Sequence, residues 1–141
     1  MSEANKAIVR NILERADKSD ITLIDDLVDP SYVDHNPPPF QGPATGAQGA
    51  RDAFNAAVEI FSDWRHEVLD QYAEGDYVIT RVRGTGRHTG EFLGVPASNN
   101  DVTMDGIAIH RVVDGKVVEH WGQVDALALL MQMGALPPLG G

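Results

Sequence analysis

The chain of 141 residues contains no cysteine. Its absence excludes disulfide bonds, thiolate metal ligands and a cysteine nucleophile. The chain also lacks any run near the ~20 apolar residues that a membrane span needs, and its amino-terminal segment has no uninterrupted apolar stretch of the signal-peptide kind. We therefore expect a cytoplasmic protein with no membrane contact.

Positive charge is scarce. There are 21 acidic and 11 basic residues, and the formal net charge is −10. Because binding to phosphates requires a basic stripe, we expect no nucleic-acid partner. Hydrophobic residues make up 43% of the chain, an ordinary balance for a folded domain. The length predicts one domain over residues 1–141, with residues 135–141 as a loose tail.

The motifs of several enzyme classes are also missing. No GxSxG, P-loop or GxGxxG pattern occurs, and the five histidines show neither HxH nor HExxH spacing. A tetrahedral metal site needs several ligands that the fold can bring together. We therefore expect no metal and no cofactor.

Helical periodicity dominates the first half of the chain. Helices are predicted over residues 2–17, over a short stretch that starts at Ser19 and ends before Pro30, and over residues 46–61. The last of these has an apolar face that includes Phe54 and Phe61. Both phenylalanines can serve the core, a ligand cavity, or both.

A period of two follows. Strands are predicted over residues 64–73, 76–88, 102–113 and 116–125, and a final helix starts near Asp125 and stops at Met133-Gly134. Helices first and an antiparallel sheet afterwards indicate the α+β class, with helices packed against one face of a curved sheet.

The hairpin between the last two strands closes on Asp114-Gly115, the type of dipeptide that forms two-residue turns. A turn of this length sets Val113 opposite Lys116. Side chains alternate between faces, so this register places four facing pairs on one face: His110 with Glu119, Ala108 with Trp121, Gly106 with Gln123, and Met104 with Asp125. The other face receives Ile107, Ile109, Arg111, Val118, His120, Gly122 and Val124.

The first face has the composition of a ligand pocket, since small residues leave room, apolar ones line it and a few polar groups point inward. Asp125 can be a helix N-cap. It can also be a base whose pKa is raised by desolvation next to Trp121 and Met104. His110 can be a core histidine satisfied by Glu119, or a catalytic group. In this register His120 points away from His110.

A second polar cluster, Tyr32, Asp34, His35 and Asn36, precedes a proline-rich segment. Read alone, these residues are hydrogen bonders that anchor a loop. His35 and Asn36 are also candidates for substrate contact.

Three stretches resemble the SnoaL-like polyketide cyclases, or ester cyclases, of the nuclear-transport-factor-2-like superfamily: YVDHNP from Tyr32, GTGRHTGEFLGVP from Gly84, and the block from Asp105 to Gly134. The resemblance implies a cone-shaped α+β barrel, in which a curved antiparallel sheet wraps around three N-terminal helices and leaves a deep apolar cavity. It also implies a homodimer or homotetramer formed through the outer face of the sheet.

The resemblance further implies an intramolecular aldol-type ring closure on a hydrophobic polyketide-like carbonyl or ester substrate, without cofactor. In that reaction Asp125 takes a proton from carbon and a histidine assists, with His110 as the match and His35 and His120 as the other options. The residues expected to contact substrate are Trp121, Met104, Phe54, Phe61, His35, Asn36 and Gln123. Two alternatives stay open: a non-catalytic small-molecule-binding oligomeric domain, and an isomerase that uses the same pocket.

Overall fold

A computed structural model describes residues 2–37 and 42–137. Four helices and six strands follow one another in the order α1 (Ser2–Asp17), α2 (Leu23–Leu27), β1 (Val28–Asp34), β2 (Ala44–Thr45), α3 (Gly46–Ile60), β3 (Phe61–Glu74), β4 (Tyr77–His88), β5 (Asp101–Val113), β6 (Lys116–Val124) and α4 (Ala126–Gln132). The α+β class is confirmed.

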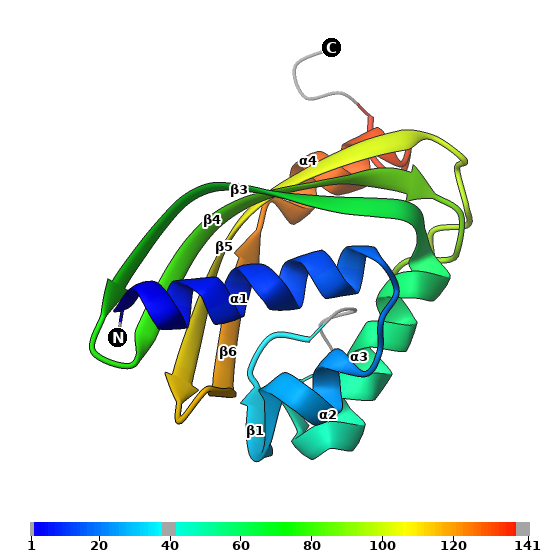
Figure 1. The fold of residues 1–141 in the computed structure, drawn as a ribbon. Helices are drawn as coiled ribbons and strands as arrows, with labels where there is room; N and C mark the ends of the chain where they lie inside the picture. The colour runs from blue at the N-terminus through cyan, green and yellow to red at the C-terminus, as the bar shows by residue number, and fades with distance from the viewer. Residues whose placement is uncertain (1, 38–41, 138–141) are drawn as a thin grey trace.

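All six strands belong to one curved sheet with the order β2-β1-β6-β5-β4-β3, which does not close into a barrel (Figure 1). Neighbouring strands are antiparallel except β1 and β6, which run parallel. The predicted curved antiparallel sheet therefore contains one parallel pair. The parallel pairing brings the end of β1 beside β6.

Helix α1 crosses the concave face of the sheet, α3 packs against β1, and α4 packs against β5 (Figure 1). The first helix has the bounds predicted for it. The main core cluster joins Val9 of α1 and Ile24 of α2 to Val112 of β5 and Val117 of β6, all at most 2% exposed. Burial of such side chains is worth roughly 1.5–3 kcal/mol each, so this cluster fixes the hairpin against the helices.

The second helix is shorter than predicted, because α2 ends at Leu27 and Pro30 lies within β1. A proline has no N–H to donate to a neighbouring strand. It is accommodated here because the pairing of β1 with β6 is irregular between Val28 and Val33.

The glycines of β4 do not themselves form a bulge. The register shifts occur in the β3–β4 pairing, between Ser62 and Arg65 and between Val68 and Asp70. A Cβ atom added at Gly84 or Gly86 would collide with the ring of Trp64. These glycines therefore let Trp64 lie flat across the concave face.

Within residues 2–37 and 42–137 no helix is long and apolar enough to cross a membrane. Part of the predicted tail, residues 138–141, lies outside the described residues. The deep apolar cavity stays a prediction.

Candidate active site on the concave face

The hairpin of β5 and β6 contains a bulge that the turn alone does not reveal. Val113 pairs with Lys116 as predicted, and Val112 then pairs with Val117, but Arg111 pairs with Glu119. Val118 is therefore an extra residue in β6. A single inserted residue moves every later side chain of a strand to the opposite face.

The predicted faces were consequently half right. His110 shares the concave face with Ala108, Gly106 and Met104 as expected. Beyond the bulge, the β6 residues are exchanged: His120 and Gly122 lie on the concave face, while Glu119, Trp121 and Gln123 lie on the convex face. The prediction that His110 and Trp121 share a face was wrong, and so was the prediction that His110 and His120 point apart.

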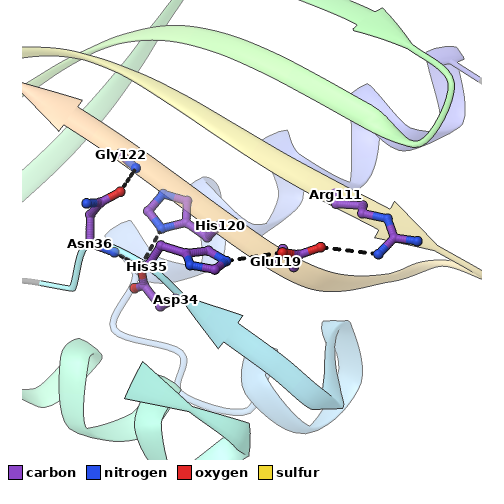
Figure 2. A network of polar contacts seen from close by, with 7 residues as sticks. All are labelled: Asp34, His35, Asn36, Arg111, Glu119, His120 and Gly122. Carbon is purple, nitrogen blue, oxygen red and sulfur yellow. Dashed lines mark hydrogen bonds and ion pairs between the residues drawn. The ribbon is translucent and has the colours of Figure 1, made fainter. Parts of the chain in front are cut away.

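His120 forms the centre of the concave site (Figure 2). Its Nδ1 donates a hydrogen bond to Oδ1 of Asp34 over 2.9 Å. The Asp34 side chain is only 8% exposed, whereas that of His120 is 21% exposed. A histidine whose Nδ1 carries the proton has its lone pair on Nε2, so this nitrogen is a potential base.

The end of β1 holds this pair in place through the backbone of β6. The N–H of His35 donates to the carbonyl of His120 over 2.9 Å. The N–H of Gly122 donates to Oδ1 of Asn36 over 3.0 Å, and the N–H of Asn36 donates to Oδ1 of Asp34 over 3.0 Å. Asp34, His35 and Asn36 thus fasten β1 to β6 while Asp34 orients the imidazole.

His110 lies next to His120 on the same face, and the ring centroids are 4.7 Å apart. It is 8% exposed. Burial, reinforced by the nearby His120, lowers the pKa of His110 well below its usual value, so the ring is neutral at physiological pH. Its buried Nδ1 has no hydrogen-bond partner among the described residues. Buried polar atoms are rarely left unpaired in folded proteins.

Small residues adjoin the two histidines, because Gly122 pairs with Ala108 across β6 and β5. Among the described residues, and apart from its two chain neighbours, a Cβ atom added at Gly122 would have two neighbours within 4 Å, both from His120: Cε1 at 3.2 Å and Nε2 at 3.5 Å. The Nε2 edge of His120 therefore borders the free volume that the described residues leave above Gly122.

The convex face of the same hairpin carries a different network (Figure 2). Nε2 of His35 donates to Oε2 of Glu119 over 3.1 Å, and Arg111 donates to Oε1 of the same carboxylate over 3.2 Å. The ring of His35 stacks on Trp121 with centroids 4.6 Å apart and planes 4° apart. The hydrogen bond from His35, followed by that from Arg111, lowers the pKa of Glu119.

Asp125 is the N-cap residue of α4. Its Oδ1 accepts a hydrogen bond from the N–H of Ala128 over 3.0 Å, and the residue is exposed. The expected enclosure of this carboxylate beside Trp121 was wrong, because the bulge turns Trp121 to the convex face. The N-cap alternative is confirmed, and a catalytic role for Asp125 stays a prediction.

The other residues predicted to contact substrate are distributed over three regions. Phe54 packs against the core cluster formed with α1 and α2, while Phe61 and Met104 pack against a second cluster that includes Leu129 of α4. Gln123 is exposed on the convex face. Their contacts with substrate stay predictions. Over the described ranges, no group of three or more acidic or histidine side chains is arranged to hold a metal ion.

Sequence reasoning missed the pairing of His120 with Asp34. Both residues were visible in the sequence, Asp34 in a polar cluster and His120 beside Trp121. The missing information was the parallel pairing of β1 with β6 and the bulge at Val118, neither of which has a short-range sequence signal.

The geometry can be compared with known proteins. The family model described as SnoaL-like polyketide cyclase matches residues 6–133. The chain belongs to this family. It is 31% identical over 114 residues to aklanonic acid methyl ester cyclase DnrD of Streptomyces peucetius, an alignment that covers 77% of this chain and 72% of the relative.

Two further relatives support the assignment. The nogalonic acid methyl ester cyclase of Streptomyces nogalater is 24% identical over 120 residues, which cover 79% of this chain and 83% of the relative. The solved structure of TsrD from Streptomyces laurentii superimposes with a TM-score of 0.85 at 28% identity, covering 96% of this chain and 98% of TsrD. The SnoaL-like chain is thus an enzyme of the polyketide cyclase type.

Proposed function

We propose that this SnoaL-like protein closes a ring in a hydrophobic, polyketide-like carbonyl or ester substrate by an intramolecular aldol-type addition on the concave face of its sheet. The observation that carries the proposal is the pair of imidazoles, His110 and His120, with centroids 4.7 Å apart beside open space. Relatives named as methyl ester cyclases act on aklanonic and nogalonic acid methyl esters. We therefore infer a substrate of the same chemical class.

The reaction requires two functional groups from the protein. A base must remove a proton from the carbon next to a carbonyl, and a hydrogen-bond donor must stabilise the enolate oxygen that forms. His110 suits the second task, because a neutral imidazole can donate one N–H in surroundings that disfavour a permanent positive charge.

Two groups have the chemistry of the base. Asp125 is the aspartate that the family resemblance assigns, and its exposed carboxylate caps α4. His120 has its Nδ1 bound to Asp34 and its Nε2 edge on the free volume. An Asp125→Asn variant keeps the size and the capping oxygen and cannot take the proton, so it tests the first candidate.

The decisive experiment is incubation of the purified protein with aklanonic acid methyl ester and with nogalonic acid methyl ester, followed by chromatography and mass spectrometry. Ring closure yields a product of unchanged mass with one carbon–carbon bond more. An isomerase would return an open-chain product. Tight binding of either ester without conversion would identify the chain as a non-catalytic binder, and the proposal would be abandoned.

We also propose that two copies associate through the convex face. Tyr72, Tyr77 and Ile107 are 62%, 42% and 50% exposed there, a concentration of large apolar side chains that gains from being covered. Sedimentation equilibrium should give twice the chain mass or more, and Ile107→Glu should return it to the mass of one chain. A monomeric wild-type protein at micromolar concentration would contradict this part.

A further inference from the structure

The described residues include two histidine–aspartate pairs, and the pairs differ in one respect that bears on catalysis. In both, Nδ1 of the imidazole bonds to a carboxylate: His120 to Asp34, and His66 to Asp17. The second nitrogen of His66 accepts a hydrogen bond from the indole N–H of Trp64 over 3.2 Å. That lone pair is occupied, so His66 is closed to a substrate.

The second nitrogen of His120 is differently placed. It borders the volume above Gly122, where an added Cβ atom would meet, among the described residues other than its chain neighbours, only atoms of His120 within 4 Å. The His120 side chain is 21% exposed although its carboxylate partner is almost covered. This is the arrangement of a base that is oriented on one side and accessible on the other.

From this geometry we infer that His120 is the catalytic acid–base residue of the concave site, and that Asp34 is its positioning residue. The inference rests on the proposed ring closure, which it deepens by naming the group that moves the proton. Gly122 then marks where the reacting carbon of the substrate lies, because a side chain at that position would fill the approach to Nε2.

His120 alone both takes up the proton and returns it. Nε2 of neutral His120 takes the proton from the carbon next to the carbonyl, and the electron pair of that C–H bond becomes the enolate. The enolate carbon attacks the second carbonyl carbon, so a C–C bond forms and the π electrons of the C=O move to oxygen. The N–H of His120 then returns its proton to this alkoxide, and no oxidant, reductant or co-reactant is needed.

The contribution of Asp34 is to fix the tautomer. Its Oδ1 accepts from Nδ1 of His120 and from the backbone N–H of Asn36, so the carboxylate itself cannot rotate freely. A carboxylate on Nδ1 favours the tautomer with the lone pair on Nε2 and stabilises the imidazolium that forms when the proton is taken. His110, buried at its side, supplies no competing charge.

Proton abstraction can be measured apart from ring closure. The probe is an aryl alkyl ketone with one enolisable position and no second carbonyl to attack, incubated with the full-length protein in D₂O. Loss of the α-proton signal in ¹H NMR reports the base alone. We expect His120→Gln to lower this exchange by about 10²–10⁴-fold, the usual contribution of a positioned base.

Two variants serve as controls. His66→Gln removes the other aspartate-bound histidine. This variant should exchange the α-proton within about twofold of the wild-type rate, because Nε2 of His66 already accepts a hydrogen bond from Trp64. Gly122→Ala leaves both members of the pair unchanged, and its methyl group would lie 3.2 Å from Cε1 of His120. It should fold normally, by circular dichroism and thermal melting, and still lose exchange with a raised KM.

A spectroscopic readout tests Asp34. The ¹⁵N shifts of His120 should show a protonated Nδ1 and an unprotonated Nε2 in the wild type, and a loss of that preference in Asp34→Asn. This variant should lower kcat more than it raises KM. A wild-type His120 with its proton on Nε2 would overturn the assignment of Asp34.

The outcomes separate the two proposals. Exchange that depends on His120 without ring closure of either polyketide ester would overturn the proposed function and retain the base. Ring closure that survives His120→Gln and disappears in Asp125→Asn would overturn the base and retain the function. Wild-type exchange rates in Gly122→Ala would contradict the approach over Gly122, and an absence of exchange in the wild type would overturn the base outright.

Discussion

The two faces of the β5–β6 hairpin each carry a histidine bonded to a carboxylate, but in different surroundings. On the concave face His120 and Asp34 are 2.9 Å apart with side chains 21% and 8% exposed. On the convex face His35 and Glu119 are 3.1 Å apart with side chains 34% and 26% exposed. The pairing is the same, so the surroundings decide what each pair can do.

The convex pair is saturated with partners, because Glu119 also binds Arg111 and His35 stacks on Trp121. Such a cluster ties β1 to β6 and leaves little capacity for chemistry. The concave pair borders open space at Gly122 and a neutral His110. Of the two pairs, only the concave one leaves a ring nitrogen accessible, which is the condition that a histidine must meet to act as a base.

Turnover should show the largest difference between variants of the concave face and variants of the convex face. His120→Gln should reduce ring closure by about 10²–10⁴-fold, since the base is lost. Glu119→Gln, the matched change on the convex face, should stay within about threefold of wild type, well short of the loss of a catalytic group. Steady-state kinetics on aklanonic acid methyl ester would measure both, and equal losses in the two variants would remove the distinction between the faces.

The second-largest difference is expected in the free energy of unfolding of variants that lack an isoleucine on one face or the other. Ile24 is 2% exposed and packs with the concave residues of the hairpin, whereas Ile107 on the convex face is 50% exposed. Ile24→Ala should lower the free energy of unfolding by about 2–5 kcal/mol, the cost of a buried cavity. Ile107→Ala should change it by about 0.5 kcal/mol or less in the monomer. Urea unfolding at low protein concentration would check this order.

Mild acid should lower the free energy of unfolding through His110 on the concave face. Burial lowers the pKa of folded His110, while the unfolded chain has the ordinary value near 6.5. Below about pH 6.5 the unfolded state therefore binds a proton that the folded state does not, and the free energy of unfolding falls by up to about 1.4 kcal/mol per pH unit. Above that pH the effect is absent.

Replacing this histidine isolates the effect. In His110→Gln that part of the decline below about pH 6.5 should disappear, because the folded pKa of His110 is lowered from its ordinary unfolded value. Urea unfolding of both proteins at pH 7.5, 6.5 and 5.5 would show it. Parallel curves for wild type and variant would mean that His110 takes up a proton in the folded state.

The smallest effect is expected from the convex carboxylate. Its partners lower the pKa of Glu119, so the interaction stabilises the fold above the unfolded pKa and is lost as pH falls through the folded one. Glu119→Gln should cost about 0.2–1 kcal/mol at pH 7 and progressively less as the pH falls below the unfolded value, and added salt should reduce the cost. A cost that does not change with pH or salt would point to packing and not to charge.

Much of the fold could be predicted from local patterns, and the errors are long-range. The helices over Ser2–Asp17 and before β3, the turn at Asp114-Gly115 and the cap at Asp125 each depend on neighbouring residues, and all are present. The pairing of β1 with β6 depends on residues 86 positions apart, as the Asp34–His120 contact shows. No local pattern specifies such a contact.

The site was predicted less well for the same reason. His110 was placed on the correct face, because the extra residue lies in β6 and the alternation along β5 is unbroken from the turn. The faces of His120 and Trp121 were predicted the wrong way round. The extra residue, Val118, follows another valine, and the sequence does not show which of the two leaves the regular pairing. A turn fixes register only up to the first bulge.

The extra residue Val118 makes the side chains that reach the concave face depend on the length of β6. Loss of that one residue would leave the turn and every other side chain of the hairpin in the sequence. It would nevertheless bring an indole and a glutamate to the interior and send the imidazole of His120 to solvent. Among descendants of such a hairpin, a single-codon deletion would therefore be a change of active site, although an alignment would record it only as a gap.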